Sequence, residues 1–297
     1  MFVLAHVSDL HMASRPALAA LTGKRGLGFI NWQRKRKAIH RPEVLDAITR
    51  DLKACRAHHI AVTGDLVNFS LADEYRRARA WLDALGPAQD VTVIPGNHDV
   101  YVPSAVPSPA AYWDDYMRGD DGAAGFPFVR LRDNVALIAL STGVPTGPFM
   151  ATGRLGPRQL ARLAEALRHT RGHFRVVLIH HPPISPPERY LRRLTDAAPL
   201  RGVLAEYGAE LLLHGHDHRR SLVWLDGPDG TKIPAIGAPS ASALAPHGGE
   251  DGAGYNIFRI DGAAPDFHIE MMSRQRAPDG SVGEVARQTI APTAGRG

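Results

Sequence analysis

The feature that most constrains this chain is a set of five polar clusters, each standing directly after an apolar run. The runs "FVLAHVS", "HIAVT", "TVI", "RVVLI" and "ELLLH" are typical of buried β-strands. The clusters that follow them are Asp9-Leu-His11, Gly64-Asp65, Gly96-Asn97-His98-Asp99, His180-His181-Pro-Pro and Gly215-His216-Asp217-His218. If these strands lie side by side, the clusters meet at one edge of a sheet. In open α/β sheets that edge binds ligands.

Strand and helix patterns alternate along most of the chain. The sequence predicts strands at Phe2–Val7, "HIAVTGD", "DVTVIPG", "NVALIAL", "FRVVLIHH" and "AELLLHG", and helices after Pro42 and over 71–85, 157–167 and 200–207. Short strands follow His218 in "SLVWLDG", "TKIPAIG", "GYNIFRI" and "DFHIE". Alternating elements followed by a run of strands predict one α/β domain, with more antiparallel strand in its second half.

The domain is expected to span residues 1–273, with a basic insertion at 12–42 and a cap-like segment rich in Pro and Gly at 101–127. Residues 274–297 are polar and rich in Gly, Pro and Ala, so we expect a loose tail. The first apolar run is too short for a signal peptide, and no stretch approaches the roughly 18 apolar residues of a membrane span. A single cysteine, Cys55, excludes an internal disulfide and favours a cytoplasmic protein, with a place at the inner membrane face still open.

Positive charge is concentrated in the insertion. The whole chain carries +5, yet residues 12–42 hold eight Lys or Arg and no Asp or Glu, so the remainder is net negative. The basic residues of loop 15–41 are interleaved with Leu, Phe, Ile and Trp. This composition suits a solvated loop, a surface facing an anionic membrane or an acyl chain, or, less favoured, a nucleic-acid backbone. Because the insertion starts directly after His11, we expect it to overhang the cluster edge.

The clustered side chains have the chemistry of metal ligands. Asp9 and Asp65 supply carboxylates, Asn97 an amide, and the other positions imidazoles. An O/N set without thiolate suits Mn, Fe, Zn or Co and argues against an iron–sulfur or structural zinc site. Seven such groups exceed one tetrahedral site but can surround two ions that share a carboxylate. Each cluster alone has an ordinary explanation as a turn or a chance pair, so the interpretation rests on all five together.

This ordered set resembles the calcineurin-like metallophosphoesterase superfamily. The resemblance covers roughly residues 2–220, and Asp-x-His, Gly-Asp, Gly-Asn-His-Asp, His-x-Pro-Pro and Gly-His-x-His are all intact. It implies a four-layer α/β/β/α sandwich with two mixed sheets. The motif wording is most similar to class III cyclic-nucleotide phosphodiesterases and glycerophosphodiesterases.

The resemblance also implies roles for individual residues. It assigns Asp9, His11 and His218 to a first metal ion, Asn97, His180 and His216 to a second, and Asp65 to a bridge between them. His180 is preferred to His181 because it directly ends its strand. Asn97 and His98 would contact the substrate phosphate, with His98 stabilising charge or protonating the leaving alkoxide, and Asp99 would orient His98.

The expected activity is in-line hydrolysis at phosphorus with two divalent ions, Mn²⁺ and/or Fe²⁺/Fe³⁺, while Zn²⁺ and Co²⁺ stay open. We expect a phosphodiesterase acting on a cyclic nucleotide or a glycerophosphodiester. The main alternative is a pyrophosphohydrolase acting on a lipid-linked nucleotide sugar such as UDP-2,3-diacylglucosamine at the membrane surface. A nuclease and a catalytically silent scaffold are less favoured. The Gly-flanked strands near the C-terminus could form a homodimer interface.

Overall fold

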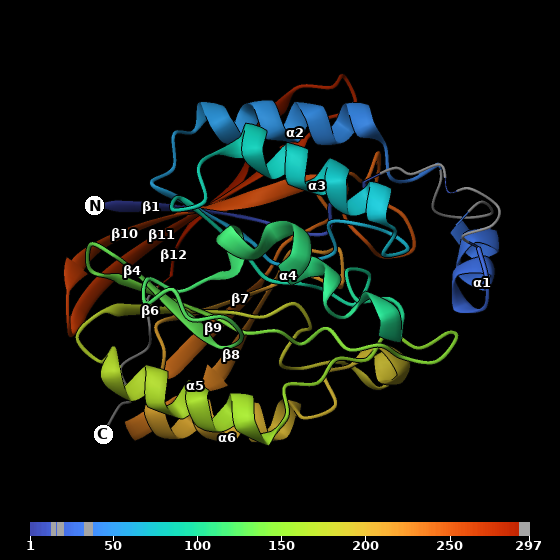
Figure 1. Cartoon of the computed structure of the whole chain (residues 1–297). Coiled ribbons are helices and arrows are strands. Elements are labelled where there is room, and N and C mark those ends of the chain that lie inside the picture. Colours follow the sequence, from blue (N-terminus) through green and yellow to red (C-terminus); the bar gives the residue numbers. More distant parts are fainter. Residues whose placement is uncertain (13–15, 17–20, 33–37, 291–297) are drawn as a thin grey trace.

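Two six-stranded sheets form the centre of the molecule (Figure 1). The computed structural model describes all residues except 13–15, 17–20, 33–37 and 291–297. The first sheet contains, in spatial order, β12 (Val282–Ile290), β11 (Asp266–Arg276), β10 (Gly254–Ala263), β1 (Phe2–Val7), β2 (His59–Val62) and β3 (Val91–Val93). The second contains β4 (Phe128–Arg132), β5 (Val135–Ala139), β6 (Phe174–Leu178), β7 (Leu211–His214), β9 (Lys232–Gly237) and β8 (Ser221–Asp226).

Helices cover the outer faces of both sheets. The α-helices are α1 (Lys24–Asn31), α2 (Pro42–Ala54), α3 (Ala72–Leu85), α4 (Ser108–Trp113), α5 (Pro157–His169) and α6 (Ala197–Tyr207), and short 3₁₀ turns occupy Pro103–Ala105, Asp114–Met117, Pro187–Arg192 and Pro228–Gly230. In Figure 1, α2 and α3 lie on one side of the sheets and α5 and α6 on the other. Both sheets are mixed, since β1, β2 and β3 run parallel while β10 opposes β1, and β4 and β8 oppose the parallel core of the second sheet. The predicted α/β/β/α sandwich is confirmed.

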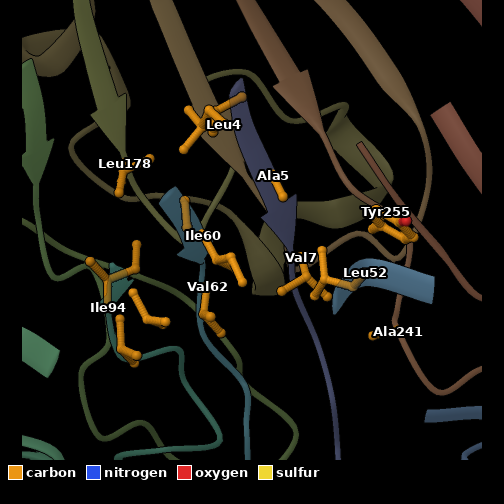
Figure 2. Close-up of a cluster of buried hydrophobic side chains, with 14 of the residues drawn as sticks. Leu4, Ala5, Val7, Leu52, Ile60, Val62, Ile94, Leu178, Ala241 and Tyr255 are labelled. Carbon is orange, nitrogen blue, oxygen red and sulfur yellow. The ribbon is translucent and has the colours of Figure 1, made fainter. Parts of the chain in front are cut away.

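The inner strands β5, β6 and β7 of the second sheet are buried on both faces. Along β6, Val176 and Leu178 join the central cluster between the sheets, while Val177 joins the cluster beneath α5 and α6. This alternation follows from the two-residue period of a strand. Figure 2 shows Leu178 in the same central cluster as Leu4 and Ile60 of the first sheet.

The predicted loose tail is wrong for residues 282–290. These residues form β12, which pairs antiparallel with β11 from Ile269↔Ile290 to Arg276↔Val282. The predicted boundary at residue 273 falls inside β11. Most of β12 is exposed, as expected of an edge strand, so its polar composition hides its pairing. Residues 291–297 lie outside the described part of the chain.

The segment 101–127, predicted above as cap-like, contributes buried side chains to the core. Trp113 is fully buried, and its ring lies 5.3 Å from that of Tyr75 on α3. Tyr112 stacks on the same Tyr75 ring at 5.3 Å. The segment therefore packs into the core of the first half of the fold. Its first residue, Tyr101, reaches the cluster edge.

None of the helices in the described part of the chain has the length and apolar composition of a membrane span.

Replacement of Leu137 by Ala tests the core between the sheets. Leu137 is fully buried on β5, so Leu137→Ala should lower the free energy of unfolding by about 2–5 kcal/mol, measured by urea denaturation. The matched control is Leu131→Ala on the neighbouring strand β4, where the side chain is 45% exposed and the expected loss is below about 0.5 kcal/mol. Equal losses for the two variants would contradict this packing.

Candidate metal centre

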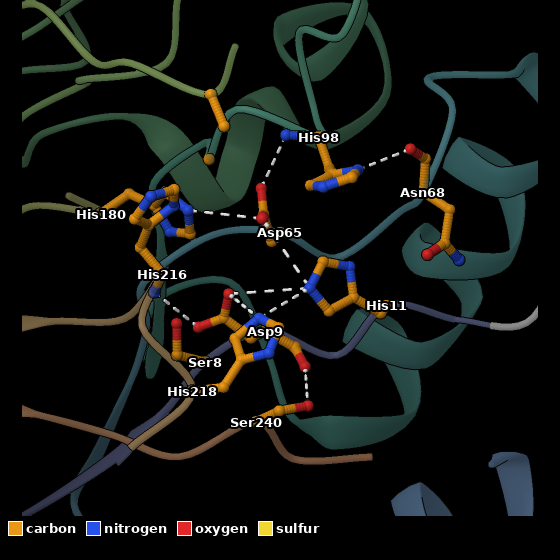
Figure 3. Close-up of polar contacts among 12 residues, drawn as sticks. Ser8, Asp9, His11, Asp65, Asn68, His98, His180, His216, His218 and Ser240 are labelled. Carbon is orange, nitrogen blue, oxygen red and sulfur yellow. Dashed lines mark hydrogen bonds and ion pairs between the residues drawn. The ribbon is translucent and has the colours of Figure 1, made fainter. Parts of the chain in front are cut away.

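The five polar clusters meet where the strands of both sheets end (Figure 3). They follow β1, β2, β3, β6 and β7. Backbone pairing continues past the strand ends, with the amides of Asp9 and His11 donating to the carbonyls of Gly64 and Asp65, both at 3.0 Å. The Gly215 amide donates to the His180 carbonyl at 3.1 Å. Neighbouring strands are therefore held in register up to the clusters, which fixes the side chains at a common edge.

Several of the predicted ligands have an unusual backbone conformation. Positive φ angles occur at Asp9 (55°), His11 (42°), Asp65 (55°), His216 (69°) and His218 (52°). Non-glycine residues adopt this left-handed region infrequently, and such strain gathers at functional sites. In a strand, successive side chains point to opposite faces. The tight turns break this alternation, so successive polar side chains point toward the same space.

One group of ligands centres on His11. Its Nε2 lies 3.1 Å from His218 Nε2 and 3.7 Å from Asp9 Oδ1. The same Asp9 oxygen lies 3.1 Å from His218 Nε2. The other ring nitrogen of His218, Nδ1, donates to Glu250 at 2.8 Å, which fixes the ring with Nε2 toward the group.

A second group lies across the Asp65 carboxylate. Asp65 Oδ2 is 3.4 Å from His180 Nε2 and 3.8 Å from His11 Nε2, so this oxygen faces both groups. Atoms of Asp65, His180 and His216 lie within 4.8 Å of one another, and so do atoms of Asp65, His11 and His98. His180 Nδ1 donates to the Thr63 carbonyl at 2.6 Å and thereby directs Nε2 toward Asp65.

The residues present fit a metal ion. Asn97 Oδ1 and His216 Nε2 are buried and make no hydrogen bond within the described chain. A buried polar atom without a hydrogen bond destabilises the folded state by about 1–3 kcal/mol. A bound metal ion would supply the missing partner. An amide oxygen and an imidazole nitrogen are both ligands for Mn, Fe, Zn or Co. These two orphaned atoms belong to residues predicted as ligands of the second ion.

The two carboxylates dominate the electrostatics of the centre. Burial opposes protonation of His180, yet the charges of Asp65 and Asp9 outweigh it and raise the pKa of His180 to about 9. Burial likewise opposes protonation of His218, where Asp9 and Glu250 raise the pKa to about 9. His216 differs, because burial and the neighbouring His181 and His180 hold its pKa well below the usual value. Positive charge is thus drawn to the space around Asp9 and Asp65.

The predicted role of Asp99 is wrong in its detail. The Asp99 carboxylate accepts hydrogen bonds from four backbone amides, those of Asp65 (2.8 Å), Leu66 (2.9 Å), Val67 (3.1 Å) and Gly96 (2.8 Å). The imidazole of His98 instead donates from Nδ1 to the Asn68 carbonyl at 2.7 Å. Burial and the charge of Asp65 raise the pKa of Asp99 to about 7, whereas the four amides favour the charged form. Asp99 organises the loops, and the Asn68 carbonyl orients His98.

The remaining polar residues of the clusters have structural partners. His181 Nδ1 lies 2.7 Å from Thr142 Oγ1, and its Nε2 donates to the Ala151 carbonyl at 3.1 Å, which agrees with the preference for His180 as ligand. Asp217 forms an ion pair with Arg189. His214 Nδ1 donates to the Gly215 carbonyl at 3.1 Å.

Sequence reasoning missed Glu250 and the Asn68 carbonyl. Glu250 comes from the loop "HGGED", which shows neither strand nor helix periodicity, so nothing in the sequence connects it with His218. Asn68 lies three residues after Asp65 of the Gly64-Asp65 cluster, but it acts through its backbone, which a side-chain motif does not reveal.

A cleft with about 200 Å³ of space lies beside Asn97 and His98. Helix α1 of the basic insertion contributes Lys24, Leu27 and Gly28 to the lining. Trp32, Phe149, Met150 and Arg192 also line the cleft. Tyr101 stacks parallel on the His98 ring at 5.3 Å, and Lys24 Nζ lies 4.1 Å from the centre of the Tyr101 ring. The expected position of the insertion next to the cluster edge is thus confirmed for its described residues.

Comparison with known proteins gives the family. The sequence model of the calcineurin-like phosphoesterase family matches residues 2–220, and the chain belongs to that family. The purple acid phosphatase PPD1 from yellow lupin has a similar fold, with a TM-score of 0.60 and 13% identity over 98% of this chain and 53% of the lupin chain. This chain thus spans about half the length of the lupin enzyme.

Two bacterial structures are also similar. The NAD nucleotidase of Haemophilus influenzae gives a TM-score of 0.49 and 10% identity over 98% of this chain and 50% of that one. Yfce, a phosphoesterase from E. coli, gives 0.41 and 14% over 98% and 100%. No curated protein sequence matches the chain significantly.

Replacement of Asp99 by Asn tests its structural role. The amide group presents N–H toward backbone amides that need an acceptor, so Asp99→Asn should lower the free energy of unfolding by about 2 kcal/mol or more. The measurement is urea denaturation in the presence of a chelator, which removes any contribution from bound ions. Asp46→Asn, at an exposed position on α2, serves as the control. Unchanged stability would restore a role for Asp99 confined to His98.

Proposed function

We propose that this protein is a dinuclear metal-dependent phosphodiesterase. The observation that carries the proposal is the position of the Asp65 carboxylate, which belongs both to the group with His180 and His216 and to the group with His11 and His98. Asp9, His11, Asp65 and His218 would hold one ion, and Asp65, Asn97, His180 and His216 the other. When bound, two such ions would lower the pKa of a water molecule and would neutralise charge on the phosphate oxygens.

The residues around the ions divide the remaining tasks. A hydrogen bond from Nδ1 to the Asn68 carbonyl orients the His98 ring, so Nε2 is the nitrogen that faces the substrate in this proposal. A protonated His98 donates from Nε2 to a phosphate oxygen and then to the leaving alkoxide, for which general acid catalysis contributes about 10²–10⁴-fold. The backbone amide of His98 donates to Asp65 Oδ1 at 2.7 Å, which couples the position of this acid to the carboxylate shared by both groups.

The cleft beside His98 favours a diester over a monoester. A monoester phosphate needs room only at the ions, whereas a diester carries a second organic group that must be accommodated. The cleft provides this room and is lined by aromatic and apolar side chains, with cationic groups at Lys24 and Arg192. A second organic group can therefore contact both apolar and polar side chains of the cleft.

A substrate panel with Mn²⁺-loaded protein tests this function. We expect bis-p-nitrophenyl phosphate to be cleaved with a higher kcat/KM than p-nitrophenyl phosphate. The panel also contains 3′,5′- and 2′,3′-cyclic AMP, glycerophosphodiesters and UDP-2,3-diacylglucosamine. Asp65→Ala should reduce every activity by about 10²-fold or more, because it removes a group shared by both ions. A dominant monoesterase activity, or an active Asp65→Ala variant, would contradict the proposal.

A second candidate function is pyrophosphate hydrolysis of an acylated nucleotide sugar at a membrane surface. The observation in its favour is the apolar mouth of the cleft, where Leu27 is 47% exposed, Phe149 83% and Met150 39%. Exposed apolar side chains beside a polar reaction centre suit an amphiphilic substrate. Of the described basic residues of the insertion, Lys24 donates to Thr146, Arg25 donates to the Phe69 and Ser70 carbonyls, and Arg41 pairs with Glu43. Arg15 and the basic residues at 34–37 lie outside the described part of the chain.

Replacement of Phe149 by Ser separates the two functions. An acyl chain would bury this side chain, so Phe149→Ser should raise the KM for UDP-2,3-diacylglucosamine by about 10-fold or more while the kcat for bis-p-nitrophenyl phosphate stays unchanged. Val285→Ser on β12, where the side chain is 50% exposed, is the matched control. An unchanged KM for the acylated substrate, or no cleavage of it by the parent protein, would remove the second candidate.

A further inference from the structure

The basic insertion leaves the metal centre after His11 and returns to it at His40. The return is fixed by backbone pairing, because the Arg41 amide donates to the Ser242 carbonyl at 3.0 Å and the Leu244 amide to the Ile39 carbonyl at 2.8 Å. His40 lies between these bonds and is only 4% exposed. Its side chain is therefore held at the cluster edge by the short bridge to residue 243.

The ring of His40 packs against two of the predicted ligands of the first ion. Its centroid lies 4.6 Å from that of His11 and 5.6 Å from that of His218. Each of the three residues offers a ring nitrogen, and these nitrogens lie within 4.8 Å of one another. Ligands around one ion, each about 2.0–2.1 Å from it through nitrogen, are brought together at this scale of separation.

The second nitrogen of His40 has the partner that a metal ligand requires. His40 Nδ1 lies 2.8 Å from Ser242 Oγ, and Ser240 Oγ, which donates to the Asp9 carbonyl at 2.7 Å, is 3.4 Å from the same nitrogen. A histidine that binds metal through one nitrogen commonly fixes its ring by a hydrogen bond from the other. His218 shows the same arrangement with Glu250.

Buried histidines elsewhere in the fold are arranged differently. His6 and His59 each have Nε2 bonded to a threonine hydroxyl, at 2.9 Å from Thr63 and 2.8 Å from Thr92. Burial lowers the pKa of both rings to about 3, so they serve as neutral core groups. In the described part of the chain, neither belongs to a group of three potential ligands, whereas His40 does. Burial alone therefore does not account for the placement of His40.

We propose that His40 binds the first metal ion through Nε2, as a ligand additional to Asp9, His11, Asp65 and His218. This inference rests on the metal centre of the proposed function. Five protein ligands exceed the four of a typical zinc site and favour Mn or Fe. An ion bound by His11 and His40 also joins the two ends of the insertion, and so ties the segment that carries α1 and one wall of the cleft to the metal centre.

A crystal structure of the full chain loaded with Mn²⁺, with anomalous data at the Mn edge, tests the proposal. A peak within about 2.0–2.3 Å of His40 Nε2, shared with His11 and His218, would establish it. Two peaks with His40 Nε2 beyond 3 Å from both would overturn this inference and leave the dinuclear centre standing. Absence of any peak near Asp65 would overturn both.

Metal affinity gives a second readout that is independent of activity. In calorimetric titration with Mn²⁺, His40→Ala should weaken one of the two binding events by about 10-fold or more and leave the other within about twofold. Ser242→Ala, which releases His40 Nδ1, should weaken the same event by a smaller factor. His268→Ala, an exposed histidine on β11, is the control. Affinities in His40→Ala equal to those of the control would overturn the proposal, and thermal unfolding checks that the variant is folded.

Discussion

The carboxylate of Asp99 is the group on which the rest of the metal centre depends. Its four hydrogen bonds join the loop after β2 to the loop after β3, since Asp65, Leu66 and Val67 belong to one and Gly96 to the other. The Asp65 carboxylate also links these two loops, because it accepts a hydrogen bond from the backbone amide of His98. A Cβ at Gly96 would overlap the Asp65 carboxylate, so only glycine permits this approach. Asp65, the proposed shared ligand, and His98, the proposed general acid, are therefore positioned together.

Asp9 connects the second sheet to the joined loops after β2 and β3. Asp9 Oδ2 accepts the backbone amide of His216 at 2.9 Å, which brings β1 of one sheet and the loop after β7 of the other into one centre. Gly215 lies against Ser8 and Asp9 so closely that a side chain there would overlap both. The sandwich therefore provides both a hydrophobic core and a common edge at which residues of the two sheets meet. Its two sheets end at the same edge, and each supplies predicted ligands that the other lacks.

Much of the fold and the candidate site could be predicted because they depend on local patterns. Apolar strands of period two and the polar residues that end them are visible in the sequence, as for Leu211–His214 before His216. Strand β12 was missed because exposed edge residues carry little apolar signal, and Asp99 was misassigned because its partners are backbone amides. Glu250 and His40 lie far along the chain from the predicted ligands that they contact. The tertiary pairing of residues 39–41 with 242–244 places His40, and the hydrogen bond to His218 places Glu250.

The proposed function requires Asp65 to join two metal ions in one centre. Electron paramagnetic resonance of the protein titrated with Mn²⁺ tests it most directly. We expect the second equivalent of Mn²⁺ to produce the broadened, temperature-dependent signal of two spin-coupled ions, and we expect Asp65→Ala to lose this coupling. Saturation at one equivalent, or two equivalents with the six-line signals of isolated ions, would contradict it.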